Sequence, residues 1–180
     1  MPRDLKAVIF DFDFTLADSS SGIIECVTAA LAELGISAPP IEKIVATIGL
    51  SLADTLKELS DVSDVSLARR FAECFHQRAD QTMEAATVIY DCVRPMLLSL
   101  RAVDLRTAIV TTKLNRRIRS ILASREMLPF FDVIVGAEDV KKTKPDPEGL
   151  LLALARLGVR AGSAVYVGDH VIDAQAAQGA

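Results

Sequence analysis

Residues 7–13 read AVIFDFD, an unbroken apolar run that leads into two aspartates spaced two positions apart. A short run that is apolar at every position is typical of a strand buried on both faces, as in a parallel sheet covered by helices. Ligands of such sheets bind beyond the carboxyl ends of the strands, which is where Asp11 and Asp13 fall. The stretch therefore predicts the first strand of a core and the position of a site.

Three further apolar runs follow the same pattern, at Ala108–Val110, Val133–Val135 and Ala164–Val167. Segments whose apolar residues have helical spacing lie between them, at 115–126 and from Pro147 to the residue before Gly158. Strands that alternate with helices in this way predict an α/β fold with a Rossmann-like, doubly wound parallel sheet.

The segment between the first two strands is far longer than a single crossover helix requires. Its apolar residues recur at helical spacing, for example Ile23, Val27, Leu31 and Leu34, and no strand is predicted within it. We therefore expect an all-helical domain inserted at residues 17–87. Residues 1–16 and 88–180 would form the catalytic core.

The composition is that of one soluble globular protein, with 180 residues, 51% of them hydrophobic and 24% charged. The net charge of −4 does not favour nucleic acid or an anionic membrane as a partner. Neither a signal peptide nor a membrane-spanning run is visible, so we expect a cytoplasmic monomer or homodimer. The three cysteines form no CxxC pair and are expected to be buried, reduced thiols.

Polar side chains follow each predicted strand where it ends. They are Asp11, Asp13, Thr111, Thr112, Lys113, Lys144, Asp169 and Asp173. Carboxylates, hydroxyls and lysines gathered at one edge fit a hard cation such as Mg²⁺ together with a phosphate group.

Asp11 and Asp13 can divide the chemistry of phosphate-ester hydrolysis between them. In an extended chain, side chains two residues apart project to the same side. Asp11 would attack phosphorus and form an aspartyl-phosphate. Asp13 would protonate the leaving oxygen and then take a proton from the hydrolytic water.

Cations must offset the repulsion between a carboxylate and a phosphate dianion. Mg²⁺ is expected on Asp11, on a backbone carbonyl near Asp13 and on Asp169, with Asp173 one helical turn further along and within reach of the metal or its waters. Lys144 would neutralise the nucleophile and the phosphoryl oxygens.

Two threonines complete the predicted site. The hydroxyl of Thr111 and the backbone N–H of Thr112 can hold phosphoryl oxygens. Lys113, which follows them, receives no specific role from the sequence.

Four segments resemble the motifs of the haloacid dehalogenase superfamily. They are DFDFTLADS at 11–19, IVTTK at 109–113, KPDPE at 144–148 and GDHVID at 168–173. Within the superfamily the likeness is greatest to phosphoglycolate phosphatases and related small-phosphate phosphatases. The resemblance implies a Rossmann-like core, a helical cap inserted after the first motif, and Mg²⁺. It also implies that Gly49, in IGLSL at 48–52, lies in a substrate-facing loop of the cap.

Two positions depart from the family pattern. Phe14 stands where glycine is common, and Thr112 stands where asparagine is usual. Asp13 favours ester hydrolysis over dehalogenation, because an alkoxide leaving group needs a proton and a halide does not.

The predicted function is that of a Mg²⁺-dependent phosphoric monoester hydrolase acting on a small phosphorylated metabolite similar to phosphoglycolate. One alternative is a sugar-phosphate mutase like β-phosphoglucomutase, which would use the same motifs. Another is a catalytically weak, truncated fragment that acts as a binding domain, because the chain stops at Ala180 soon after a helix begins near Ile172.

Overall fold

A computed structural model describes residues 4–60, 62 and 64–180 of the chain. The chain divides into two compact units. One unit joins Met1–Ala17 to Ile89–Ala180, and the other is Asp18–Val88. Both borders of the second unit lie one residue later in the chain than the borders of the inserted segment, which was predicted at 17–87.

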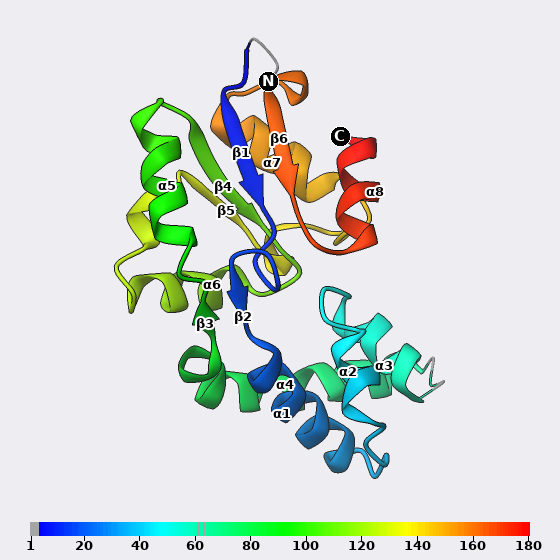
Figure 1. Cartoon of the computed structure of the whole chain (residues 1–180). Coiled ribbons are helices and arrows are strands. Elements are labelled where there is room, and N and C mark those ends of the chain that lie inside the picture. The colour runs from blue at the N-terminus through cyan, green and yellow to red at the C-terminus, as the bar shows by residue number, and fades with distance from the viewer. Residues whose placement is uncertain (1–3, 61, 63) are drawn as a thin grey trace. The chain divides into compact units, whose positions relative to one another are not determined.

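The first unit is built on a parallel sheet of four strands, β1 (Ala7–Phe10), β4 (Arg106–Val110), β5 (Val133–Val135) and β6 (Ala164–Val167). Their order is β5-β4-β1-β6, and every pairing is parallel (Figure 1). Phe10 pairs with Ile109 and Val167, so the segments that follow β1, β4 and β6 emerge at the same edge. The predicted α/β fold class with a parallel sheet is confirmed.

Helices of the first unit are α5 (Val93–Ala102), α6 (Asn115–Ala123), α7 (Glu148–Leu157) and α8 (Val171–Gly179). Short 3₁₀ turns η1, η2 and η3 lie at Leu128–Phe130, Ala137–Asp139 and Ala161–Ser163. The predicted end of α7 is confirmed, because Gly158 adopts φ 66° at its C-cap. That left-handed conformation costs a glycine little.

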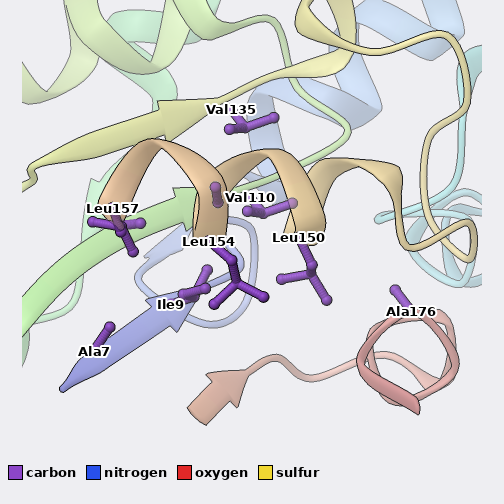
Figure 2. Close-up of a cluster of buried hydrophobic side chains, with 10 residues drawn as sticks. Ala7, Ile9, Val110, Val135, Leu150, Leu154, Leu157 and Ala176 are labelled. Atoms are coloured by element: carbon purple, nitrogen blue, oxygen red, sulfur yellow. The ribbon is translucent and has the colours of Figure 1, made fainter. Parts of the chain in front are cut away.

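One face of the sheet is covered by α7, which lays Leu150, Leu154 and Leu157 against Ile9 and Val110 (Figure 2). Ala176 of α8 belongs to the same buried cluster. Figure 1 shows α5 on the other side of the sheet, where it contacts β4. Because alternate strand residues point to opposite faces, the continuous apolar runs serve both layers.

Strand β6 differs from the prediction that each apolar run is buried on both faces. Val165 is 39% exposed and Val167 is 40% exposed, whereas their neighbours Ala164 and Tyr166 pack against the cluster under α7. The strand lies at the edge of the sheet. A run of four apolar residues does not reveal its place in a sheet, so the prediction was wrong for this strand.

The second unit contains α1 (Ser20–Glu33), α2 (Ile41–Val45), α3 (Leu52–Ser60) and α4 (Val65–Ala86). Its two longest helices, α1 and α4, pack on each other through buried apolar faces that include Val27 and Phe71.

Two short strands lie at the borders of the units, where β2 (Ala17–Asp18) pairs with β3 (Val88–Ile89). The prediction that the segment between the first two predicted strands, residues 13–107, contains no strand is therefore wrong for both β2 and β3. Two-residue strands are too short to carry a periodic pattern.

Two expectations from composition can be compared with the structure. Cys26 is buried as predicted, but Cys74 is only partly buried and Cys92 is exposed, because Cys92 lies in the turn that precedes α5. Within the described residues, no helix combines the length and apolar character that crossing a membrane requires.

Candidate active site

The loop after β1 turns sharply and buries both aspartates. The N–H of Asp11 donates to Val167 O at 2.8 Å, which continues the ladder one residue beyond the strands. Phe14 then adopts φ 57° and donates its N–H to Ala17 O at 2.7 Å. Asp11 and Asp13 are 2% and 7% exposed as a result. The Phe14 side chain is thus accommodated in a left-handed conformation that would suit glycine better.

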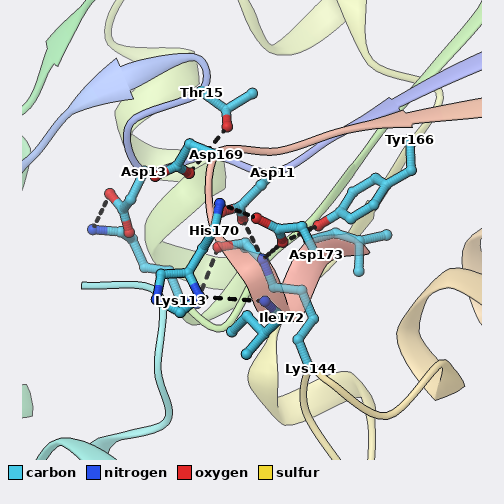
Figure 3. Close-up of polar contacts among 12 residues, drawn as sticks. Asp11, Asp13, Thr15, Lys113, Lys144, Tyr166, Asp169, His170, Ile172 and Asp173 are labelled. Atoms are coloured by element: carbon cyan, nitrogen blue, oxygen red, sulfur yellow. Dashed lines mark hydrogen bonds and ion pairs between the residues drawn. The ribbon is translucent and has the colours of Figure 1, made fainter. Parts of the chain in front are cut away.

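Lys144 bridges two buried carboxylates (Figure 3). Its Nζ lies 2.8 Å from Asp11 Oδ1 and 2.6 Å from Asp173 Oδ1. Burial raises the pKa of Asp11 to about 6, with smaller contributions from the charges of Asp173 and Asp13 and with Lys144 acting in the opposite direction. Burial alone would lower the pKa of Lys144, but the two carboxylates outweigh it and raise that pKa.

Asp173 uses both of its oxygens within the protein. Oδ1 also lies 2.9 Å from the hydroxyl of Tyr166, and Oδ2 accepts the backbone N–H of His170 at 2.9 Å. Burial opposes ionisation of Asp173, but Lys144 and these hydrogen bonds hold its pKa below the usual range. Gly168 packs directly on this carboxylate, because a Cβ there would lie 2.4 Å from Asp173 Cγ.

A second ion pair joins Lys113 to Asp13. The distance from Nζ to Asp13 Oδ1 is 3.1 Å, and the two side chains are 6% and 8% exposed. The backbone N–H of Lys113 donates to Thr111 Oγ1 at 3.2 Å, and its amine lies 5.9 Å from the centre of the Phe12 ring. Sequence reasoning noted Lys113 at this strand end but gave it no role.

Tyr166 was missed altogether, because within β6 it has the pattern of a core residue. Its hydroxyl lies 3.0 Å from Val110 O as well as close to Asp173, and its ring lies 5.9 Å from Lys144 Nζ. Burial raises the pKa of its phenol, so Tyr166 stays neutral beside the carboxylate. A polar aromatic residue one position before the last strand residue was the only available signal.

The carboxylates offer a place for a divalent cation. One oxygen from each of Asp11, Asp169 and Asp173 can be chosen so that all three lie within 4.8 Å of one another. Among the described residues, the four predicted aspartates lie with two lysines, Lys113 and Lys144, so negative charge is in excess at the site. Hard oxygen donors and this charge fit Mg²⁺ or a similar ion. Asp169 is the most accessible donor, held by the hydroxyl of Thr15 at 3.3 Å.

Three further predicted residues are Thr111, Thr112 and Gly49. Thr111 is buried at the end of β4, and Thr112 beside it is partly exposed. Gly49 lies in the helical unit with φ 103°, a conformation that favours glycine. Its contact with substrate stays a prediction, as do the metal and phosphate contacts of the other residues.

Known proteins resemble the chain over nearly its whole length. Residues 8–180 match the family described as haloacid dehalogenase-like hydrolase. A protein of Nitrosospira multiformis named phosphoglycolate phosphatase is 34% identical, over 99% of this chain and 81% of that protein. A protein of the same name from Salmonella typhimurium is 30% identical, over 99% and 79%.

A crystal structure from Bacteroides fragilis, assigned to the haloacid dehalogenase-like hydrolases, superimposes with a TM-score of 0.94 at 36% identity. The matched region covers 97% of this chain and 83% of the chain in that crystal structure. The family predicted from the four motifs is thus confirmed, and the chain belongs to the haloacid dehalogenase-like hydrolases.

Proposed function

We propose that this chain hydrolyses a small phosphate monoester, similar to phosphoglycolate, through a phosphoryl group carried on Asp11. The observation that supports this most is the buried carboxylate of Asp11, which is paired with Lys144 and lies two residues from a second buried carboxylate, Asp13. Two relatives named phosphoglycolate phosphatase point to the same class of substrate.

The proposed reaction has two steps. A carboxylate oxygen of Asp11 attacks phosphorus, the bond from phosphorus to the ester oxygen breaks, and Asp13 gives its proton to the departing oxygen. Asp13 then takes a proton from water as that water attacks phosphorus, and the carboxylate of Asp11 is released. Asp13 is thus protonated both at the start and at the end of the cycle.

The attack requires Asp11 in its charged form, which burial opposes. Lys144 favours that form from 2.8 Å, and Asp173 keeps the lysine in place. A divalent cation, which we propose to be Mg²⁺, would be held by Asp11 and Asp169, with Asp173 and the turn at Asp13 beside it. When bound, it would neutralise charge on the phosphoryl group. Thr111 and the N–H of Thr112 are proposed to hold phosphoryl oxygens, and Gly49 to contact the substrate.

The test is phosphate release from a panel of esters that includes phosphoglycolate, glycerol phosphate and a hexose phosphate. Asp11→Asn should lower kcat/KM by about 10³-fold or more, because an amide is not a nucleophile here. Asp91→Asn, a matched change at an exposed aspartate of the same unit, should leave it unchanged.

Circular dichroism should show that both variants fold. Substantial phosphate release by Asp11→Asn would contradict the mechanism. Isomerisation of a hexose phosphate with little free phosphate would indicate a mutase instead.

A further inference from the structure

The two aspartates after β1 are paired with different lysines. Asp11 pairs with Lys144, whereas Asp13 pairs with Lys113. The lysines also come from different strand ends, since Lys113 follows β4 and Lys144 follows β5 and η2. Two buried amines at two carboxylates suggest separate tasks, one at the nucleophile and the other at the proton-transfer group.

The amine of Lys113 is held in place on several sides. Its backbone follows β4 and donates to Thr111 Oγ1, and its side chain passes beside the Phe12 ring to reach Asp13 Oδ1. Since Phe12 belongs to the turn that carries Asp13, the lysine contacts both the carboxylate and the turn beneath it. With only 6% of its side chain exposed, Lys113 has little freedom to move away.

We propose that Lys113 is a positioning residue that fixes one oxygen of Asp13 and so aligns the carboxyl group with the leaving oxygen of the ester. This inference rests on the proposed function. Proton transfer requires the donor and acceptor atoms at hydrogen-bond distance, and a carboxyl group free to rotate would meet that geometry only part of the time. Lys113 acts through Asp13, so its effect should depend on how much the leaving group needs a proton.

A series of aryl phosphates tests this dependence, because its members share a shape and differ in the acidity of the released phenol. Phenyl, 4-nitrophenyl and 2,4-dinitrophenyl phosphate would be compared by kcat/KM, which covers the steps through release of the phenol. For Lys113→Met, kcat/KM should fall about 10²-fold with phenyl phosphate and less than about threefold with the dinitrophenyl ester. Lys113→Arg should recover part of the loss.

The reference variants are Asp13→Asn and the double variant Lys113→Met/Asp13→Asn. Asp13→Asn should show the same steep dependence on the leaving group. The double variant should be no worse than Asp13→Asn alone, because Lys113 has nothing to align once the acid is gone. Lys141→Met, at an exposed lysine, is the matched control and should match the unaltered chain across the series.

Loss of the lysine leaves a buried carboxylate without its ion pair, so Lys113→Met can fail to fold. The double variant removes both charges. If Lys113→Met does not fold, the comparison of the double variant with Asp13→Asn tests the positioning role. An equal loss on all three esters, or a double variant clearly worse than Asp13→Asn, overturns the positioning role while phosphatase activity stands. An unaltered chain that releases phosphate neither from these three esters nor from phosphoglycolate, glycerol phosphate or a hexose phosphate overturns the proposed function and the positioning role together.

Discussion

Gly168 is the residue at which the site has no room for a side chain. The carboxylate of Asp173 lies against Gly168, so a Cβ on residue 168 would displace it. The same carboxylate holds Lys144. Gly168→Ala should therefore move Asp173 and Lys144 together. We expect kcat/KM to fall about 10²-fold, since small misplacements of catalytic groups have effects of this size. We also expect the free energy of unfolding to fall by about 1–3 kcal/mol.

The matched control is Gly162→Ala, in the turn before β6, where a Cβ would meet no atom within 4 Å. Steady-state kinetics and urea unfolding on both variants measure the two effects. Normal activity in Gly168→Ala would show that Asp173 is not needed to place Lys144.

Single residues also show what the sequence could predict about the site. Asp11, Asp13 and Lys144 were identified because each follows a strand, or the loop after it, in a recognisable motif. The ion pair between Lys113 and Asp13 was not predicted, because the direction of a side chain in a loop depends on the turn of another segment, here the one at Phe14. Asp173 was expected near the metal, and the structure adds that its oxygens hold Lys144, Tyr166 and the N–H of His170.

At the scale of elements, the turn that follows α6 contains a residue in an unfavourable conformation. Glu126 has φ 55° and is exposed, and the following N–H of Met127 closes the helix end on Leu122 O at 2.8 Å. Glycine is favoured in this position of a helix end. Glu126→Gly should raise the free energy of unfolding by about 0.5–1 kcal/mol, after allowance for the greater freedom of glycine in the unfolded chain.

Urea unfolding measures this change, and Glu58→Gly is its counterpart. Glu58 is exposed within α3, where glycine should instead destabilise by about 1 kcal/mol. The free energy of unfolding should therefore rise in one variant and fall in the other, because the two glutamates differ in backbone conformation. A loss of stability in both variants would contradict the account of Glu126.

Elements were predicted well where they are long or bounded by clear signals. The limits of α7 follow from Pro147 and Gly158, which are helix start and stop residues. The exposure of Val165 and Val167 and the pairing of β2 with β3 were not foreseen, because both depend on neighbours distant in the sequence.

For the molecule as a whole, Asp11 should couple stability to pH when no divalent cation is present. Its folded pKa of about 6 lies above the ordinary 3.8, so the native state binds more protons between these values and stability falls as pH rises through them. In chelator, Asp11→Asn should match the unaltered chain near pH 4. At pH 7 it should be more stable by up to about 3 kcal/mol.

Thermal unfolding at a series of pH values measures the difference between the two proteins. Addition of Mg²⁺ at a hundredfold excess over its Kd should stabilise the unaltered chain by about 2.7 kcal/mol and the Asn variant by much less. A stability difference that does not vary with pH would contradict the burial argument. Equal responses to Mg²⁺ would contradict cation binding at Asp11.

The excess of negative charge among the four aspartates and two lysines has a consequence for how the binding of one ligand affects the other. Without a cation, the site repels a phosphate dianion. A bound divalent cation offsets that negative charge and so lowers the repulsion. Thermodynamic reciprocity then requires that the phosphate ester strengthen cation binding by the same factor. The two ligands should bind with positive heterotropic cooperativity, and calorimetry should show that inorganic phosphate binds weakly in chelator and more tightly as the cation concentration rises.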